Sequence, residues 1–318
     1  MYDTTKPYIS EIERIIRTTW DTKYLRVDER GIHKKKPFDY TAMFFDHVDG
    51  IGTKGMDHWR KRTFDAAVTD VLAMNLNDFC LARAIPTSLC DHIFLPTDDR
   101  EAIVQIVSHL AAECNMRHIA ITAGETAIHD NMNGMEISMM MSGFKRSVEP
   151  NQYRQGDILI GIGSSGAHAS GFTRIHSVYD DWELLPESIT TPTLIYIDVV
   201  DSIDRVFGIH GMTHITGGAF TKIKRFLGTC DAHIGRSHNL EPHSIFWDLL
   251  EKGIPEKEMY QTFNCGIGFV IGVPVVKKSV CLSTLKEAKF NADIIGNVTS
   301  GSGNVHIQSK FSDQEYIY

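Results

Sequence analysis

Residues 156–172 read GDILIGIGSSGAHASGF, and this stretch decides the fold class. Residues 157–162 are mostly apolar and are typical of a short buried strand. They open into the small residues 163–171, and a helix is expected over 170–179. A strand followed by a glycine loop and a helix is a recurring unit of proteins that build one core from both kinds of element.

The same alternation continues toward both ends of the chain. In the second half, Thr216-Gly217-Gly218 is a glycine turn that should open a helix ending near Phe226. Helices are also expected over 9–20, 65–83, 99–114, 243–251, 255–260 and 279–289, and strands over 41–45, 118–122, 136–144, 267–273 and 292–298. Residues 22–40 are polar and predict a loop or a mobile arm. The class is therefore α/β or α+β.

Length and composition suggest two domains. A chain of 318 residues exceeds the size at which single cores usually stop growing. Residues 145–156, KRSVEPNQYRQG, are polar and contain Pro150, so we expect a boundary there, with domains over 1–149 and 150–318.

The charge balance narrows the possible partners. There are 32 Lys and Arg residues against 40 Asp and Glu residues, a net charge of −8, so general neutralisation of nucleic-acid phosphates is not expected. The longest nearly apolar run, 266–276, is too short to predict a membrane span, and residues 1–19 do not resemble a signal peptide. Six cysteines without a CxxC pair indicate reduced thiols and a cytoplasmic protein.

Several carboxylates are candidates for holding a metal ion. Asp70 and Asn77 lie within about 20° of each other on one helix face, and Asp78 lies at the edge of that face. Asp49 and Glu125 each follow a short strand and stand beside a glycine. Such oxygen ligands suit Mg²⁺ bound to a nucleotide. The alternative is that Asp70, Asn77 and Asp78 form a solvent-exposed polar stripe on the helix and bind no metal.

The glycine motifs offer candidate phosphate contacts. Lys54 ends the motif DGIGTK (49–54) and could contact a phosphate, although it could equally be a surface lysine. Backbone N–H groups and hydroxyls of the 163–171 loop could receive an anion, with Ser164, Ser165 and Gly166 at its start. His214 precedes Gly217 and Gly218 and could bind phosphate or transfer a proton, or could simply stabilise the turn.

In this order and spacing, the motifs resemble the aminoimidazole ribonucleotide (AIR) synthetase family, also called phosphoribosylformylglycinamidine cyclo-ligases. The matching stretches are DGIGTK (49–54), TDVLAMNLNDF (69–79), AGETA (123–127), GDILIGIGSSGAHASGF (156–172), HITGGAF (214–220), IFWDLLEKG (245–253) and EKEMYQTFNCGIGFVI (256–271). The resemblance extends from about residue 45 to residue 300.

The resemblance implies a two-domain AIR-synthetase-like subunit that dimerises through an N-terminal sheet domain and carries a C-terminal α/β domain. It implies an ATP-dependent, Mg²⁺-assisted ring closure on a phosphoribosyl substrate, formylglycinamidine ribonucleotide. The residues it implies for ATP are Asp49, Thr53, Lys54, Asp70, Asn77, Asp78, Gly124 and Glu125, of which Asp49, Asp70, Asp78 and Glu125 would hold Mg²⁺. It places His168 and His214 near the reacting groups, and Ser164, Ser165, Gly166, Gly217 and Gly218 near substrate or phosphate.

Two segments depart from the family pattern. Family members usually carry a glycine-rich segment before DGxGTK, whereas residues 22–40 contain only Gly31 and the run Lys34-Lys35-Lys36. The usual acidic-Met-Pro-Gly run after Glu125 is replaced by Ala127-Ile128-His129-Asp130-Asn131. A related ATP-dependent enzyme with another amide or phosphate acceptor, and a non-catalytic nucleotide-binding homologue, therefore remain alternatives to the cyclo-ligase.

Overall fold

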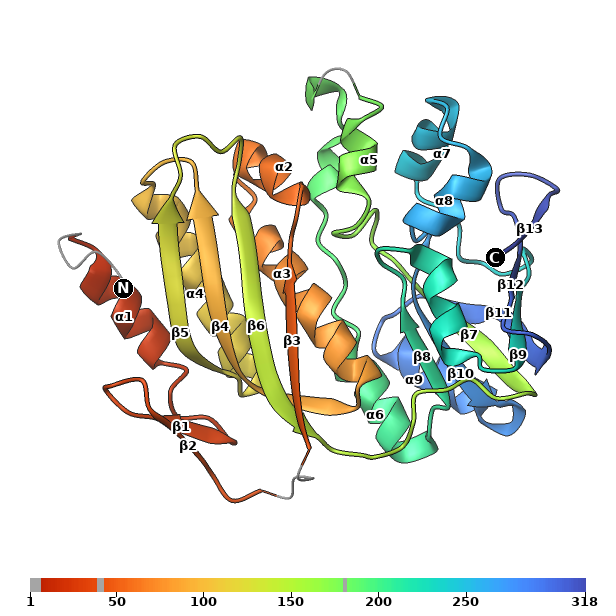
Figure 1. Ribbon diagram of the computed structural model, residues 1–318, viewed down its shortest axis with the longest axis horizontal. Helices are drawn as coiled ribbons and strands as arrows, with labels where there is room; N and C mark the ends of the chain where they lie inside the picture. Colours follow the sequence, from red (N-terminus) through yellow and green to blue (C-terminus); the bar gives the residue numbers. More distant parts are fainter. Residues whose placement is uncertain (1–6, 39–42, 180–181) are drawn as a thin grey trace. The chain divides into compact units, whose positions relative to one another are not determined.

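The structure is a computed structural model that describes residues 7–38, 43–179 and 182–318. The chain divides into two compact units, Met1–Val148 and Glu149–Tyr318 (Figure 1). Each unit combines a β-sheet with helices, which confirms the expected α/β or α+β class. Among the described residues, no helix is long and apolar enough to cross a membrane.

The first unit is built on a four-stranded sheet in the order β3-β6-β4-β5. Its strands are β3 (Phe44–Gly50), β6 (Glu136–Lys145), β4 (Ala84–Leu95) and β5 (Ala120–Ile128). β6 pairs antiparallel with both β3 and β4, whereas β4 and β5 are parallel and joined by the helix α4 (Arg100–Arg117).

Helices of the first unit pack on this sheet. The helix α3 (Phe64–Leu81) contacts β3, β4, β6 and α4 (Figure 1). Most of its residues are buried, including the polar Asp70, Asn75 and Asn77. The carboxylate of Asp99 caps α4 by accepting a hydrogen bond from the backbone N–H of Ala102 at 3.0 Å. The shorter helices are α1 (Ile9–Arg17) and α2 (Lys54–Lys61).

Several expectations for the first unit are wrong in detail. Residues 22–40 contain a hairpin of β1 (Leu25–Val27) and β2 (His33–Lys35), because Leu25 and Val27 bury their side chains against Ala120. Asp49 is the last but one residue of β3, and Gly124 and Glu125 lie inside β5, so none of the three occupies a turn after a strand. The start of the strand expected over 41–45 lies partly outside the described residues.

The second unit contains a seven-stranded sheet in the order β13-β12-β9-β11-β7-β10-β8. The strands are β7 (Asp157–Gly163), β8 (Gly211–His214), β9 (Cys230–Ile234), β10 (Ile267–Pro274), β11 (Ala292–Ser300), β12 (Val305–Gln308) and β13 (Glu315–Ile317). All neighbouring pairs are antiparallel except β12 and β9, which are parallel.

One large apolar core joins this sheet to its helices. The buried faces of β7, β9, β11 and β12 pack against α7 (Ser244–Glu251), α8 (Glu256–Thr262) and the 3₁₀ helix η3 (Ala219–Phe226). The helix α9 (Lys278–Glu287) contacts β7, β11 and α6 (Ile197–Phe207). The remaining short helices are α5 (Phe172–His176), η1 (Trp182–Leu184), η2 (Glu187–Thr190) and η4 (Val275–Lys277).

The loop elements of this unit differ from their expected form. The helix expected over 170–179 is only the five-residue α5, and the helix after Gly218 has 3₁₀ geometry. Gly218 itself has a φ of 83°, a left-handed conformation that glycine adopts without a steric penalty.

Candidate functional site

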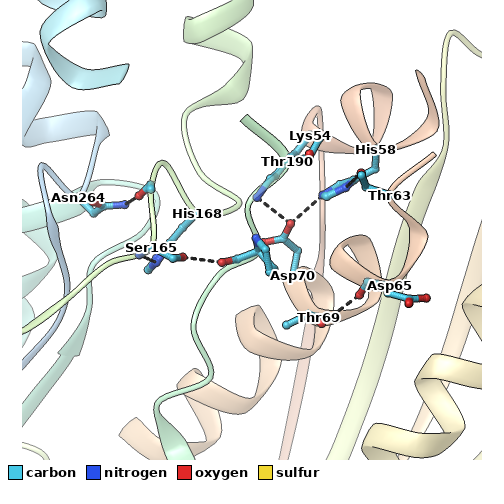
Figure 2. A network of polar contacts seen from close by, with 12 residues as sticks. Lys54, His58, Thr63, Asp65, Thr69, Asp70, Ser165, His168, Thr190 and Asn264 are labelled. Carbon is cyan, nitrogen blue, oxygen red and sulfur yellow. Dashed lines mark hydrogen bonds and ion pairs between the residues drawn. The ribbon is translucent and has the colours of Figure 1, made fainter. Parts of the chain in front are cut away.

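Lys54, His58 and Asp70 form a buried charged cluster in the first unit. Lys54 and His58 are four residues apart on α2 and therefore share one face of that helix. Both reach the same oxygen of Asp70 on α3: the Lys54 Nζ and the His58 Nε2 each lie 2.8 Å from Oδ2 (Figure 2). The other ring nitrogen of His58 lies 2.8 Å from the Thr63 hydroxyl.

The electrostatics of this cluster favour an ionised Asp70. Burial opposes ionisation, but the charge of Lys54 and the hydrogen bond from His58 together lower the pKa of Asp70 to about 2. The side chains of Lys54 and Asp70 are fully buried, so Lys54 is no surface lysine and Asp70 belongs to no solvated stripe. The role of Asp70 as a metal ligand remains a prediction, because its Oδ2 already accepts from two partners.

A second polar group gathers where β3 meets α3. The His47 Nε2 lies 3.2 Å from the Asp78 carboxylate, and its Nδ1 lies 3.0 Å from the Asn75 side-chain oxygen. Asn75 also donates to the backbone carbonyl of Asp49 at 3.3 Å. The hydrogen bond that His47 donates to the Asp78 carboxylate raises the pKa of His47, against the effect of burial. Two of the predicted carboxylates, Asp49 and Asp78, thus stand near one histidine.

Glu136 adds a carboxylate to this end of the sheet. Its Oε1 accepts the backbone N–H of Gly52 at 3.2 Å, and burial together with the charge of Asp49 raises its pKa. Thr53, the residue before α2, is half-buried, and Asn77 is fully buried on α3.

The predicted Gly124 and Glu125 lie on β5 beside another missed carboxylate. Asp91 on β4 is opposite Gly124, and a Cβ at Gly124 would come 2.6 Å from the Asp91 Oδ1. Gly124 is therefore required by the volume of Asp91. Asp91 is buried, and burial raises its pKa to about 7. Glu125 is half-buried and pairs with His92 in the sheet register.

A cavity of about 190 Å³ borders this edge strand. Trp20, Glu29 and Gly124 are among its lining residues. Trp20 donates its indole N–H to the carbonyl of Ile121 at 2.9 Å, and the Arg17 guanidinium lies 5.1 Å from the indole centroid.

The predicted Mg²⁺ ligands do not all lie in one group. Within the described residues, no three His, Cys, Asp or Glu side chains form a group able to hold a metal ion. Mg²⁺ is usually held by one or two carboxylates together with substrate phosphates and waters. Asp49 and Asp78 are half-buried and both raise the pKa of His47, so this pair of carboxylates fits that requirement.

The loop after β7 is tied down by its own hydrogen bonds. The Ser164 hydroxyl donates to the Asn264 side-chain oxygen at 2.8 Å, and the Ser165 hydroxyl donates to the Pro192 carbonyl at 2.5 Å. Asn264 also donates to the Gly166 carbonyl at 2.8 Å; Figure 2 shows it beside the loop that carries Ser165 and His168. The Ser164 and Ser165 hydroxyls are thus engaged within the unit, and the role of this loop as an anion site stays a prediction.

The two predicted histidines lie on either side of one tyrosine. His168 and His214 are fully buried, and the centroid of each ring is 6.2 Å from the Tyr196 ring. The Nε2 of His168 accepts the backbone N–H of Ser165 at 3.1 Å, so the neutral ring carries its proton on Nδ1. His214 stacks on Phe269, with ring centroids 6.1 Å apart.

The second glycine turn lies next to a lysine. Gly217 and Gly218 are exposed, and the Lys222 Nζ donates to the Thr216 hydroxyl at 2.7 Å just before them. A Cβ at Gly217 would meet no atom within 4 Å, so space is open beside this turn.

Sequence reasoning missed several polar residues of these groups: His47, His58, Asp91, Glu136, Tyr196, Lys222 and Asn264. Most of these residues lie outside the glycine motifs that can be recognised in the sequence. Asn264 is the exception, because it lies inside the stretch FNCGIG that contributed to the family resemblance.

Comparisons with known proteins cover both units. The N-terminal domain model of the AIR synthase related proteins matches residues 43–144, and the C-terminal domain model matches residues 154–308. A phosphoribosylformylglycinamidine cyclo-ligase of Clostridium perfringens is 34% identical over 278 residues, which are 82% of this chain and 83% of that protein. The cyclo-ligase of Thermoplasma volcanium is 30% identical over 282 residues, which are 82% and 81% of the two chains.

Solved structures share the fold at lower identity. Thiamine-monophosphate kinase from Stenotrophomonas maltophilia gives a TM-score of 0.67 at 17% identity, covering 97% of this chain and 98% of that one. The hydrogenase maturation protein HypE in complex with ATP gives 0.66 at 14% identity, covering 99% and 95%. These structural similarities show a shared fold. The sequence matches show homology, and the chain belongs to the AIR synthase family, together with the phosphoribosylformylglycinamidine cyclo-ligases.

Proposed function

We propose that this chain is an ATP-dependent ligase that closes the imidazole ring of aminoimidazole ribonucleotide from formylglycinamidine ribonucleotide, releasing ADP and phosphate. The observation that carries the proposal is the match to cyclo-ligases at 34% identity over 82% of the chain. In this reaction ATP phosphorylates the formyl amide oxygen. An amidine nitrogen of the same substrate then attacks the formyl carbon, the bond from that carbon to the phosphorylated oxygen breaks, and phosphate leaves. We place the reaction in the cytoplasm, since all six cysteines are free thiols.

The first unit would bind the nucleotide. Asp49 and Asp78, with Glu125, are the carboxylates that we propose for Mg²⁺, which would neutralise phosphate charge when bound. Lys54 would face the phosphates from α2, held in place by Asp70. Thr53, Asn77 and Gly124 complete the proposed nucleotide set.

The second unit would supply the groups around the phosphoribosyl substrate. The exposed turn at Gly217 and Gly218 leaves space for a phosphate, and Lys222 lies next to it. His168 and His214 are proposed to act near the reacting amide, with Ser164, Ser165 and Gly166 shaping the loop. Both rings are buried, and His168 also contacts the loop by accepting the backbone N–H of Ser165.

The test is ADP formation by the purified full-length chain with Mg²⁺–ATP, with and without formylglycinamidine ribonucleotide. The expected result is ADP release that depends on this substrate, with aminoimidazole ribonucleotide as the product. If folded protein that binds ATP releases no ADP with it, the proposed substrate is wrong.

A second candidate is a related ATP-dependent reaction on another amide or phosphate acceptor. It is favoured by one observation: the hairpin of β1 and β2 lies where family members usually have a glycine-rich segment. Including thiamine monophosphate and other acceptors in the ADP assay separates the two, since only one acceptor should stimulate turnover. ATP binding without turnover on any acceptor would instead favour a non-catalytic homologue.

We also propose that the chain forms a homodimer through the sheet of the first unit. Helices α3 and α4 pack on one face of that sheet, whereas Val48 and Met140, paired in register on β3 and β6, stay exposed on the strands. Exposed neighbouring apolar side chains of this kind mark an interaction surface. Light scattering should give a dimer mass for the native chain and a monomer mass for Val48→Asp with Met140→Asp; a monomeric native chain would contradict the proposal.

A further inference from the structure

The turn before β10 contains a buried asparagine to which the proposed reaction gives no role. Asn264 is 2% exposed and begins the turn Asn264-Cys265-Gly266, which leads into β10. Its side-chain Oδ1 accepts the backbone N–H of Gly266 at 2.9 Å, and its backbone carbonyl accepts the N–H of Ile267 at 2.9 Å. A side-chain oxygen bonded to the backbone two residues on is the usual way in which Asn or Asp closes a tight turn.

The amide of Asn264 also connects this turn to the loop after β7. Its Nδ2 donates to the Gly166 carbonyl at 2.8 Å, and its Oδ1 accepts the Ser164 hydroxyl at 2.8 Å. Ser164 donates its backbone N–H to the Gly266 carbonyl at 3.0 Å. A backbone N–H only donates and a carbonyl only accepts, so these partners fix which end of the amide is oxygen and which is nitrogen.

The turn alone does not explain why this residue is Asn. The bond from the Gly266 N–H needs only an acceptor, which the carboxylate of Asp would supply equally well. The bond to the Gly166 carbonyl needs a donor, and a buried ionised carboxylate would face that oxygen with no hydrogen to share. The amide nitrogen of Asn264 therefore serves the loop.

The residue between the two that Asn264 holds contacts a predicted site histidine. Ser165 donates its backbone N–H to the His168 Nε2 at 3.1 Å, and its hydroxyl donates to the Pro192 carbonyl at 2.5 Å. Each peptide unit is planar and shares its Cα atoms with the next, so a shift of either neighbour would move the Ser165 N–H relative to the ring. Asn264 is thus linked to His168 through one short stretch of backbone.

The position of His168 is tightly specified by its surroundings. This residue has a φ of 60°, a left-handed conformation that is uncommon for residues other than glycine. A Cβ at Gly268 of β10 would come 2.6 Å from the His168 Cε1, so the ring lies directly against that strand. An unfavourable backbone conformation of this kind persists where several contacts determine it together.

We propose that Asn264 is a positioning residue for the ring closure. By holding both neighbours of Ser165, it keeps the Ser165 N–H on the His168 Nε2, and the neutral ring then carries its proton on Nδ1. The inference rests on the proposed function, in which His168 acts near the reacting amide. Because Asn264 is buried, it affects the reaction through the loop.

The test compares the native full-length chain with Asn264→Asp, which keeps the size of the side chain and its acceptor but removes the donor to Gly166. In a ¹⁵N spectrum of the histidine rings, native His168 should show an unprotonated Nε2, and the Nε2 signal should shift in the variant. With Mg²⁺–ATP and formylglycinamidine ribonucleotide, kcat should fall about 10²-fold, while the dissociation constant for ATP stays unchanged. An unchanged Nε2 signal in the folded variant would overturn the inference.

The matched control is Asn151→Asp, because Asn151 also joins its amide to the backbone of the second unit. Its Nδ2 donates to the Met212 carbonyl at 3.0 Å, and its Oδ1 accepts the Met212 N–H at 2.7 Å. This control should lower the free energy of unfolding and leave the His168 Nε2 signal and kcat as in the native chain. Equal effects of the two variants on that signal and on kcat would reduce Asn264 to a support of the fold.

Two further measurements keep the test independent of the folding of one variant. Asn264→Ala buries no charge and should shift the same Nε2 signal. In the native chain, scalar coupling should join the Ser165 amide nitrogen to the His168 Nε2, and a protonated Nε2 there would contradict the inference. The proposed function fails separately, when the native chain forms no ADP with formylglycinamidine ribonucleotide, whereas the inference fails when His168 does not respond to the Asn264 variants.

Discussion

The Lys54 Nζ lies 2.8 Å from the Asp70 carboxylate, and both side chains are fully buried. This contact joins α2, which follows the DGIGTK motif, to α3, which carries the second acidic motif. Two motifs that look independent in the sequence are therefore one structural unit, and changing either charge leaves the other buried without its partner.

Asp70→Asn should lower the free energy of unfolding by about 3–5 kcal/mol at pH 7, because the buried Lys54 charge would lose the carboxylate that lies 2.8 Å away. The pKa of Asp70 is held at about 2, below its usual 3.8, so its contribution is complete above pH 3.8 and is lost as the pH falls toward 2. Urea denaturation measures the change. The double variant Lys54→Met with Asp70→Leu should recover most of the lost free energy of unfolding. An Asp70→Asn variant as stable as the native chain would contradict the prediction.

Asp91→Asn should stabilise the chain at pH 8 and have less effect at pH 5. Burial raises the Asp91 pKa to about 7, so the folded state holds a proton that the unfolded state releases, and stability falls as the pH rises from about 4 to about 7. A shift of one pKa unit corresponds to about 1.4 kcal/mol, so above pH 7 the Asp91→Asn substitution should raise the free energy of unfolding by at most about 4 kcal/mol.

The check is urea denaturation of Asp91→Asn at both pH values, with the exposed Asp46→Asn as the matched control. The control should show the same stability change at pH 5 and pH 8. An equal effect of Asp91→Asn at the two pH values would mean that Asp91 is ionised in the folded state throughout.

The two strands with uninterrupted apolar runs were predictable from the sequence, whereas β4 of the first unit was not. The runs over 157–162 and 267–273 predict β7 and β10, because each is buried on both faces and needs no alternation. β4 escaped prediction since it contains Pro86, Asp91 and His92. Its Pro86 stands at a register shift against β6, where a missing N–H is tolerated.

The site was predictable only where a motif marks it. Asp49, Lys54 and Asp78 belong to motifs that can be read in the sequence. His47 and Asp91 become visible only through tertiary pairing, since His47 meets Asp78 on another element and Asp91 fills the space above Gly124. The strand expected over 118–122 extends through Gly124 to Ile128, since a glycine inside a strand can leave room for the side chain of its neighbour.

Asp78→Asn should lower the pKa of His47 toward its usual 6.5, because the hydrogen bond from His47 to the Asp78 carboxylate is the main cause of the raised pKa. NMR titration of the His47 ring measures the shift, and calorimetry should show weaker Mg²⁺–ATP binding if Asp78 contacts the metal. Asp65→Asn, an exposed change on the same helix, is the control. A lowered His47 pKa with unchanged ATP affinity would remove Asp78 from the proposed metal ligands.

His214→Gln should lower kcat more than it weakens ATP binding. His214 lies in the second unit, stacked on Phe269, whereas the proposed nucleotide residues lie in the first. Loss of a proton-transfer group costs about 10²–10⁴ in rate, so a catalytic His214 predicts a fall of that size with an unchanged dissociation constant for ATP.

The matched control is His210→Gln, one residue before β8, where the native ring pairs with Asp157 at 2.7 Å. Removing that pair disturbs the same strand but changes no residue proposed to take part in the reaction. The free energy of unfolding should therefore fall while kcat stays unchanged. If His214→Gln lowers kcat and ATP affinity in parallel, or behaves like His210→Gln, the ring supports the fold of β8 and takes no part in the reaction.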